Sequence, residues 1–545
     1  MSFSSHFAET IFLQKYRHEG AESWPALCHT MVNQICANRL SKSEKSQLIK
    51  YIIDMKFIPG GRYLYYAGRK VRYINNCFLL RAEYDTREDW ANLSWKAERA
   101  LMTGGGIGVD YSIYRPSGSK LRRTGGLASG PIPKIQMLNE IGRHVMQGGS
   151  RRSALYASLH WQHGDIAAFL ASKDWHTFGI PGTDKTYWDM KQLDFNFPAP
   201  LDMTNISVNY DDKWLKLGAN SEVFLDNVKQ ALMTGEPGFS FNFGTKQNET
   251  LRNACTEVCS SDDSDVCNIG SLNLARIENK TELEDVIKLA IKFLLCGSLR
   301  SHVPYPKVKK VRGKNRRLGL GLMGVHEWLI QRNYKYECVP ELHEWLAVYK
   351  DVSTKTAKNV SNCWGITRPV ATRAIAPTGT IGILAGTTTG VEPLYAVAYK
   401  RRYLKGTSWR HQFVVDSAAK CLIDKYGTDP ESIESAIDLA NDPERRIKFQ
   451  ADIQDYVDMS IASTINLPAW GSDLNNPDKV AEFAQLIAQY APRLRGLTVY
   501  PDGARGGQPL TRVAYGEAMS KIGEEFVEAS HDICSISGKG GTCGI

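Results

Sequence analysis

The sequence predicts an α/β fold with a mostly parallel sheet, and its composition and residue pattern support this class. The chain of 545 residues is 43% hydrophobic and 23% charged, which is the composition of an ordinary globular protein. From about residue 57 to residue 520, short β-branched or apolar runs alternate with longer amphipathic stretches. This alternation indicates βαβ units, and neither an internal repeat nor a low-complexity segment interrupts it.

The N-terminal segment 1–56 is expected to be helical. Apolar residues recur at helical spacing through 24–35 and again through 48–53. The cluster 57–61 contains proline and two glycines, which break such a pattern. The sequence therefore predicts that helices precede the alternating region.

Two later stretches predict helices within the alternating region. The stretch 281–295 has acidic residues in its first turn, and Thr281 is the expected N-cap. The stretch 476–487 has Pro477 at a position that the first turn of a helix tolerates. Between such helices, a short β-like run begins at Cys77.

Charge and hydropathy exclude several classes of protein. The 67 Lys and Arg residues exceed the 58 Asp and Glu residues by nine, a mild excess that suits an anionic ligand such as a nucleotide as well as it suits DNA. Because no basic motif is interleaved with aromatic residues, a nucleic-acid partner is not expected. No run reaches the ~18 apolar residues of a membrane span, and the first residues lack a signal-peptide layout. We therefore expect a cytoplasmic protein.

The twelve cysteines are distributed unevenly. A structural zinc site usually shows a Cys-x2-Cys pair with a second pair of ligands, and this sequence has none, so no metal site is expected. Three thiols crowd into thirteen residues, at Cys255, Cys259 and Cys267. Cys534 and Cys543 lie in a glycine-rich C-terminal stretch that we expect to be flexible.

The segment 253–257 combines three reactive side chains at alternate positions. If the segment is extended, Asn253, Cys255 and Glu257 share one face. The amide would orient a substrate hydroxyl, and the carboxylate would accept its proton. The alternative is a surface loop with an incidental cysteine, in which Glu257 pairs with a cation such as Arg252. Spacing alone leaves both readings open.

Three glycine-rich segments are candidates for phosphate binding. The segment 103–108 precedes the expected strand 109–113, whereas a dinucleotide fingerprint follows a strand and opens a helix. The segment 147–152 combines glycines with two arginines. The segment 376–382 is the best candidate, because its hydroxyls and unencumbered amides suit an oxyanion. A plain turn is the alternative for each segment.

The motif Asn253-Ala-Cys-Thr-Glu257 followed by Cys267-Asn-Ile-Gly-Ser-Leu-Asn-Leu274 resembles the active-site finger of ribonucleotide reductase catalytic subunits. Further matches occur in the order found in the family and extend from about residue 55 to residue 510. They are Asn76-Cys-Phe-Leu79, Gly104-Gly-Gly-Ile-Gly108, Gln147-Gly-Gly-Ser-Arg-Arg152, Asn315-Arg-Arg-Leu-Gly-Leu-Gly-Leu-Met-Gly324, Ala376-Pro-Thr-Gly-Thr-Ile-Gly382, Ser463-Thr-Ile-Asn-Leu-Pro468 and Thr498-Val-Tyr-Pro-Asp-Gly503.

The resemblance implies a ten-stranded α/β barrel made of two five-stranded parallel halves around a central finger loop. The expected domains are a helical segment 1–56 without an ATP cone, a catalytic barrel 57–520 and a flexible redox-active tail 521–545. The implied enzyme is a ribonucleoside-diphosphate reductase that supplies deoxyribonucleotides for DNA synthesis. A homodimer with nucleotide effectors is also implied, and the stretch 180–204 is a candidate for loops that communicate effector binding.

The resemblance also implies a role for each site residue. Cys255 would be the thiyl radical that takes the 3′-hydrogen of the ribose, Glu257 the base for the 3′-hydroxyl, and Asn253 its hydrogen-bonding partner. Cys77 and Cys267 would form the reducing dithiol. Cys534 and Cys543 would be the tail pair that re-reduces it by exchange with thioredoxin or glutaredoxin. The implied substrate-binding residues are Asn76, Thr378, Gly379, Thr380, Ile381 and Gly382.

The source of the radical remains open between two cofactor systems. The compact chain favours a separate ferritin-like di-metal subunit, with Tyr500 as the last tyrosine of a relay toward Cys255. The wording of the motifs instead favours adenosylcobalamin. The chain departs from the family pattern at Asn76, where serine is frequent, and at Ala254, where proline is common in one branch. Cys259 has no assigned role. A catalytically inactive nucleotide-binding regulator is the remote alternative.

Overall fold

The computed structural model describes residues 3, 5–145, 153–194, 196–405, 408–504 and 510–527. Its main sheet has eight strands in the order β14-β15-β6-β5-β4-β3-β2-β9. These strands are β2 (Cys77–Leu80), β3 (Gly106–Asp110), β4 (Leu155–His160), β5 (Thr204–Tyr210), β6 (Gly238–Phe241), β9 (Asp265–Val266), β14 (Thr464–Leu467) and β15 (Gly496–Pro501). Strands β2 to β6 are mutually parallel, so the mixed α/β class with a large parallel sheet is confirmed.

The second sheet has three strands in the order β1-β10-β11. These are β1 (Phe57–Pro59), β10 (Asn268–Asn273) and β11 (Leu318–Met323). Strands β10 and β11 are parallel, whereas β1 is antiparallel to β10. Isolated parallel bridges join Leu320 to Arg373 and Ile375 to Ile461. Between β11 and β14, therefore, the extended segment around 373–375 is paired on both sides.

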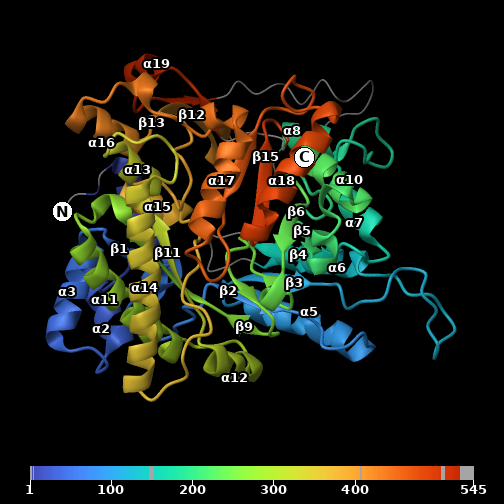
Figure 1. Cartoon of the computed structure of the whole chain (residues 1–545), viewed down its shortest axis with the longest axis horizontal. Coiled ribbons are helices and arrows are strands. Elements are labelled where there is room, and N and C mark those ends of the chain that lie inside the picture. The colour runs from blue at the N-terminus through green and yellow to red at the C-terminus, as the bar shows by residue number, and fades with distance from the viewer. Residues whose placement is uncertain are drawn as a thin grey trace, which may run out of the picture.

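Helices cover the two sheets in two separate groups (Figure 1). Around β1, β10 and β11 lie α1 (His6–Lys15), α2 (Trp24–Cys36), α3 (Lys42–Ile53), α4 (Gly61–Tyr66), α11 (Lys280–Arg300), α13 (Val325–Ile330) and α14 (Pro340–Cys363). Around the main sheet lie α5 (Arg87–Leu101), α6 (Ile132–His144), α7 (Ile166–Ala171), α10 (Glu222–Thr234) and α18 (Val480–Tyr490). Each group forms its own large apolar core, and the N-terminal helices share theirs with α11 and α14.

The predicted helices are present, with corrections at two helix starts. The stretch predicted at 476–487 opens with the 3₁₀ helix Pro477–Lys479, and α18 begins only at Val480. Helix α2 covers the predicted stretch 24–35, and α3 contains 48–53. Helix α11 begins at Lys280, because the side chain of Asn279, and not that of Thr281, accepts a hydrogen bond from the Glu282 amide. Asparagine and threonine are both suitable N-caps, so the local pattern could not decide between them. No helix in the described ranges is long and apolar enough to cross a membrane.

A third sheet lies above the other two and was not predicted. It has the order β16-β12-β13-β17 and is antiparallel throughout. Its strands are β12 (Ala398–Lys405), β13 (Ser408–Val415), β16 (Leu510–Arg512) and β17 (Glu525–Val527). It lies with α16 (Ser417–Tyr426) and α19 (Tyr515–Ser520) at the top of Figure 1. Strand β17 belongs to the segment 521–545 that the sequence assigned to a tail.

Candidate active site

The segment 253–257 forms a turn that closes a short hairpin. Strand β7 (Leu251–Arg252) pairs with β8 (Cys259–Ser260), with Arg252 opposite Cys259. The amide of Thr256 donates to the Asn253 carbonyl oxygen at 2.9 Å, and Thr256 has a positive φ of 69°. The extended conformation considered from the sequence is therefore wrong, because a turn brings the side chains together.

This turn joins the amide of Asn253 directly to the carboxylate of Glu257. Asn253 Nδ2 donates to Glu257 Oε2 at 2.8 Å, and Asn253 Oδ1 accepts from the Val258 amide at 2.9 Å. Asn253 and Glu257 are buried, whereas Cys255 at the turn is exposed. The turn thus exposes a thiol and buries an amide–carboxylate pair.

Two glycines of β3 leave the space in which this turn packs against the sheet. A Cβ atom on Gly108 would lie 1.7 Å from the carbonyl oxygen of Arg252, and one on Gly106 would lie 3.3 Å from Ala254 Cβ. Glycine inside a strand often marks the close approach of another backbone. Gly106 and Gly108 therefore serve packing of the hairpin, and their position inside a strand agrees with the rejection of a dinucleotide fingerprint. Strand β3 begins at Gly106 and ends at Asp110, so the expected strand 109–113 was placed too late in the chain.

Replacing Gly108 by alanine is expected to displace the hairpin and to lower turnover at least ~100-fold, because a misplacement of about 1 Å has this effect on a catalytic group. Overpacking also costs about 1–3 kcal/mol of folding free energy. Steady-state rates and thermal melting measure the two effects. Gly313→Ala is the matched control, since a Cβ there meets no atom within 4 Å. Normal turnover by Gly108→Ala would contradict the packing role.

Cys77 and Cys267 lie next to the Asn253–Glu257 pair. Asn253 Nδ2 is 3.3 Å from Cys77 Sγ, and the amide of Asn76 donates to the Cys267 carbonyl oxygen at 3.3 Å. Burial raises the pKa of the Cys77 thiol to about 12, and the negative charge of Glu257 adds to this shift. Burial also raises the pKa of Cys267 well above its ordinary value. Both thiols therefore keep their protons at neutral pH.

Burial raises the pKa of the Glu257 carboxyl to about 7, while the hydrogen bond from Asn253 acts in the opposite direction. In the described part of the chain, no lysine or arginine forms an ion pair with Glu257. The guanidinium of Arg252 instead donates to Asn242 Oδ1 at 2.7 Å and to main-chain carbonyl oxygens. The alternative reading, in which Glu257 pairs with Arg252, is therefore wrong.

The candidate phosphate segment begins a short helix beside a cavity. Helix α15 (Gly379–Ala385) starts at the edge of a cavity of about 510 Å³. Its wall includes Pro377, Gly379, Thr387, Thr388, Thr389, Thr464 and Asn466. The first amides of a helix lack intrahelical acceptors, so the backbone here offers donors to an anion.

The side chains of this segment are used mainly for packing. Thr378 Oγ1 accepts from the Gly390 amide at 2.8 Å, and Ile381 is buried in the apolar core. A Cβ on Gly382 would lie 2.8 Å from Thr389 Cγ2. Thr380 is half-buried and Gly379 exposed. Among the five predicted residues, backbone amides and the Thr380 hydroxyl are thus the groups suited to contact a ligand.

A short backbone path connects Glu257 to this cavity. The amide of Ser460 donates to the Glu257 carbonyl oxygen at 2.9 Å, and the amide of Ile375 donates to the Ser460 carbonyl oxygen at 3.2 Å. Pro377 in the cavity wall follows Ile375 by two residues, which is about 7 Å of extended chain. Two backbone hydrogen bonds and two residues of chain therefore link the Glu257 backbone to the cavity wall.

Tyr500 and Asn76 complete the predicted site residues in the described part. Tyr500 is half-buried on β15, directly opposite Asn466 of the cavity wall. Asn76 is also half-buried, and its Oδ1 atom has no hydrogen-bond partner among the described residues. Cys259 lies on β8 of the hairpin and packs in a small apolar core. Cys534, Cys543 and the segment 147–152 lie outside the described residues.

Ser460, Thr464 and Asn466 were missed as individual site residues in the sequence. The alternation of polar Thr464 and Asn466 with apolar Ile465 and Leu467 was a usable signal, because alternate residues of a strand face opposite sides. The two apolar residues lie in the core, and the two polar ones line the cavity. No local signal identified Ser460.

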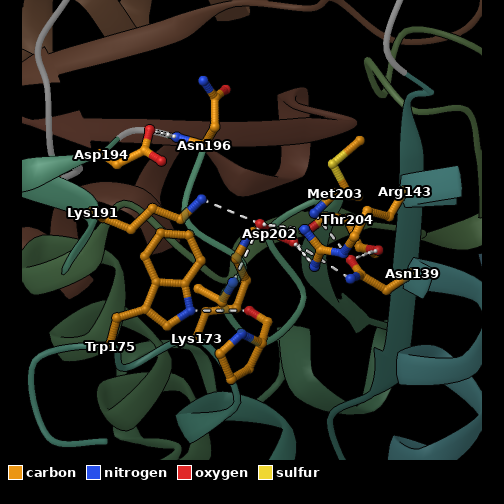
Figure 2. Close-up of polar contacts among 12 residues, drawn as sticks. Asn139, Arg143, Lys173, Trp175, Lys191, Asp194, Asn196, Asp202, Met203 and Thr204 are labelled. Carbon is orange, nitrogen blue, oxygen red and sulfur yellow. Dashed lines mark hydrogen bonds and ion pairs between the residues drawn. The ribbon is translucent and has the colours of Figure 1, made fainter. Parts of the chain in front are cut away.

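The stretch 180–204 is anchored at its C-terminal end by Asp202 (Figure 2). Its carboxylate accepts from Arg143 Nη2 at 2.6 Å and from Lys191 Nζ at 3.2 Å. Trp175 Nε1 donates to the carbonyl oxygen of Pro200 at 2.9 Å, and Lys173 Nζ donates to that of Thr204 at 2.8 Å. These contacts attach the end of the stretch, which continues into β5, to α6 and to the segment 173–175.

A family model described as "Ribonucleotide reductase, barrel domain" matches residues 75–187, 208–359 and 365–500. A vitamin B12-dependent ribonucleoside-diphosphate reductase of Mycobacterium tuberculosis is 26% identical, with 87% of this chain aligned to 74% of the relative. A protein of the same name from Thermoplasma acidophilum is 25% identical over 87% of this chain and 66% of its own length. A ribonucleoside-diphosphate reductase subunit alpha of Chlamydia pneumoniae is 24% identical, covering 52% of this chain and 31% of the relative.

Proposed function

Since this chain belongs to the ribonucleotide reductase family, we propose that the Asn253–Glu257 turn, with Cys77 and Cys267, is its active site and reduces ribonucleotides to 2′-deoxyribonucleotides. One observation supports the proposal most strongly: the side-chain amide of Asn253 contacts both the Glu257 carboxylate and the Cys77 thiol. Asn253 Nδ2 lies 2.8 Å from the Glu257 carboxylate and 3.3 Å from the Cys77 sulfur, and the same turn exposes Cys255.

The first step of the proposed reaction takes place at C3′ of the ribose. The Cys255 thiyl radical abstracts the 3′-hydrogen, so that an S–H bond forms and a C–H bond breaks. Glu257 accepts the proton of the 3′-hydroxyl, and Asn253 orients the carboxylate that receives it. A carboxyl with a pKa of about 7 suits this task, because general bases work best when their pKa lies near the working pH.

The second step replaces the 2′-hydroxyl by hydrogen. One thiol of the pair Cys77 and Cys267 protonates the leaving hydroxyl, which departs as water. The two thiols together supply two electrons and two protons, one proton to the leaving hydroxyl and one to C2′, and become a disulfide. Glu257 returns its proton to the 3′-oxygen, and Cys255 returns a hydrogen atom to C3′ and regains its radical. The raised pKa of both buried thiols supports this role, because each keeps a proton to deliver.

The substrate is proposed to lie with its ribose over the turn and its phosphates at α15. The short backbone path through Ser460 and Ile375 supports this placement. A helix N-terminus favours anionic groups, and Thr380 adds a hydroxyl. Asn76 Oδ1 is available as an acceptor for a ribose hydroxyl. The names of the best-covered relatives favour a diphosphate substrate.

The strands are proposed to close into a ten-stranded barrel of two parallel halves. One half would be β2 to β6. The other would be β10, β11, the extended segment 371–376, β14 and β15. The parallel bridges Leu320–Arg373 and Ile375–Ile461 support this second half. Antiparallel pairing of β15 with β6, and of β2 with β9, supports the two junctions.

The Cys255 radical has two candidate sources, adenosylcobalamin and a ferritin-like partner subunit. Each would supply the one-electron oxidation that turns the Cys255 thiol into its radical. The exposed position of Cys255 suits a donor that approaches from outside the chain. The relatives that align with 87% of this chain are named vitamin B12-dependent, which favours adenosylcobalamin over the ferritin-like partner subunit expected from compactness. In the alternative with a partner subunit, Tyr500 would be the last tyrosine of the relay.

An assay with adenosylcobalamin as the sole added cofactor tests both the function and the radical source. The purified chain, a ribonucleoside diphosphate and dithiothreitol are expected to yield deoxyribonucleotide when adenosylcobalamin is present. Cys255→Ser in the same mixture is the control for adventitious chemistry. Activity only after addition of a di-metal partner subunit would reverse the choice of radical source. No activity with either source would contradict the proposed function.

The two thiol pairs are expected to respond differently to the reductant. Cys77→Ser or Cys267→Ser should stop multiple turnover even with dithiothreitol, because the dithiol beside the substrate is lost. Cys534→Ser or Cys543→Ser should abolish turnover with thioredoxin or glutaredoxin but leave much of it with dithiothreitol, which enters the site directly. Cys363→Ser, at another exposed cysteine, is the control. Equal failure of the tail variants with both reductants would contradict the shuttle.

The assembly is proposed to be a homodimer regulated by nucleotide effectors. The anchored stretch 180–204 is the candidate for communicating effector binding to the site. Its attachment through Asp202 to Arg143 of α6 and its continuation into β5 support this, because α6 and β5 would move with it.

A further inference from the structure

A buried series of side-chain hydrogen bonds joins the two segments that carry Cys77 and Cys267. Asn75 precedes Cys77 by two residues, and Asn268 directly follows Cys267. Asn75 Nδ2 donates to Asn268 Oδ1 at 3.1 Å. Both side chains are 1% exposed. The amide–amide bond therefore links the two thiol-bearing segments away from water.

Both amides are also held on their outer sides. Asn268 Nδ2 donates to the hydroxyl oxygen of Tyr63 at 2.7 Å, and Ser301 Oγ donates to Asn75 Oδ1 at 2.6 Å. Tyr63 and Ser301 are buried as well. Each asparagine side chain therefore forms one hydrogen bond through its oxygen and one through its nitrogen, which fixes the orientation of both side chains.

The packing of α11 is adapted to this chain of hydrogen bonds. A Cβ atom on Gly297 would lie 1.9 Å from the Tyr63 hydroxyl oxygen. Because even alanine has no room at this position, Gly297 leaves the space in which the Tyr63 hydroxyl meets Asn268. The Tyr63 hydroxyl therefore packs closely against α11, a helix of the same apolar core.

We infer that the Asn75–Asn268 hydrogen bond positions Cys77 relative to Cys267 and thereby sets the stability of the disulfide that they form. This inference rests on the proposed function, which assigns the reducing dithiol to these two residues. Disulfide geometry is narrow, and departures from it make the bond easier to reduce. The segments are also linked by the antiparallel pairing of Phe78 with Val266 and by the 3.3 Å hydrogen bond from the Asn76 amide to the Cys267 carbonyl oxygen. The Asn75–Asn268 bond adds a side-chain link on the N-terminal side of Cys77. Asn75 and Asn268 are positioning residues, since neither reacts.

The redox step that reports on this positioning is simple. Oxidised dithiothreitol takes two electrons and two protons from the thiols of Cys77 and Cys267, and an S–S bond forms between them. When the positioning bond is lost, the sulfur atoms meet less often in the required geometry. The equilibrium should then shift toward the dithiol.

The test uses the full chain with Asn268→Ala, Asn75→Ala and the double variant. Each protein is equilibrated in dithiothreitol redox buffers, the thiols are trapped, and the Cys77–Cys267 disulfide is quantified by peptide mapping. We expect the equilibrium constant for disulfide formation to fall at least about tenfold in each single variant, which corresponds to about 30 mV. The double variant should show little further change, because both residues act through one bond.

Tyr210 provides the matched control for a buried hydroxyl. Its hydroxyl donates to Asn227 Oδ1 at 2.9 Å in the other core. Tyr63→Phe should shift the disulfide equilibrium, and Tyr210→Phe should leave it unchanged although both substitutions lose a buried hydrogen bond. Tyr63→Phe and Ser301→Ala also serve if an asparagine variant fails to fold.

Three outcomes would contradict either the positioning role of the Asn75–Asn268 bond or the proposed function, and they are distinguishable. An unchanged equilibrium in the Asn75, Asn268 and Tyr63 variants overturns the inference alone. A shift of the same size in Tyr210→Phe also overturns it, because general loosening would then explain the effect. Absence of any Cys77–Cys267 disulfide in the wild-type protein contradicts the proposed function instead.

Discussion

Replacing Cys255 by serine is expected to abolish ribonucleotide reduction with every reductant and every radical source. The O–H bond of serine is too strong to replace the S–H bond in hydrogen-atom transfer. The fold should remain intact, because Cys255 is exposed at the turn and surface substitutions usually change stability by less than about 0.5 kcal/mol. Product formation under multiple-turnover conditions and the melting temperature measure the two properties on one preparation.

Cys363→Ser is the control for this experiment. Cys363 is also exposed and ends α14, so its loss tests any general sensitivity of the protein to cysteine removal. It should turn over normally. Substantial turnover by Cys255→Ser would remove Cys255 from the proposed mechanism, whatever the behaviour of the other thiols.

Replacing Glu257 by glutamine is expected to lower turnover by about 10²–10⁴-fold, the usual contribution of general acid–base catalysis. Glutamine keeps the shape of the side chain but cannot accept the 3′-hydroxyl proton. Substrate binding should survive, so the loss should appear in kcat and only weakly in KM. Glu257→Asp keeps a carboxylate on a shorter side chain and serves as the comparison. Unchanged turnover in Glu257→Gln would exclude Glu257 as the base.

The pH profile of the wild-type protein follows from the same group. Burial raises the pKa of Glu257 to about 7, and the proposed base must be ionised to act. The kcat/KM value should therefore fall about tenfold for each pH unit below 7. This acid limb should be absent from the residual activity of Glu257→Gln. An acid limb that persists unchanged in that variant would assign the titration to another group.

Glu257→Gln should raise the free energy of unfolding at pH 8, although it lowers turnover. Because the pKa of Glu257 is raised in the fold above its ordinary value of 4.5, folding favours the protonated carboxyl. The resulting cost is absent below about pH 4.5, grows as the pH rises toward 7, and is then constant at roughly 3 kcal/mol, from 1.36 kcal/mol per pKa unit. Glu257→Gln should therefore be more stable than wild type at pH 8, and the difference should vanish near pH 4.

The sequence alone was sufficient for the mixed α/β class, for several helices and for proposing 253–257 as the reactive segment. Helices α2 and α3 follow from the spacing of their apolar residues, which is a local property. The grouping of Asn253, Cys255 and Glu257 was visible because the three residues are close in the chain. Their connection with Cys77 and with the segment 376–382 came from the order of family motifs, since no local pattern contains it.

Only the tertiary structure decided how these segments meet. The turn at Thr256, the contact of Asn253 with Cys77 and the fit of Gly108 beneath Arg252 all depend on backbones that are far apart in sequence. The same is true of the bond between Asn75 and Asn268. The shifted pKa of Glu257 also belongs to this level, because it arises from burial by distant segments. Periodicity and motifs depend on residues that are near one another in the sequence, so they predict local structure. Burial and the close approach of distant backbones are determined by the packing of the whole molecule.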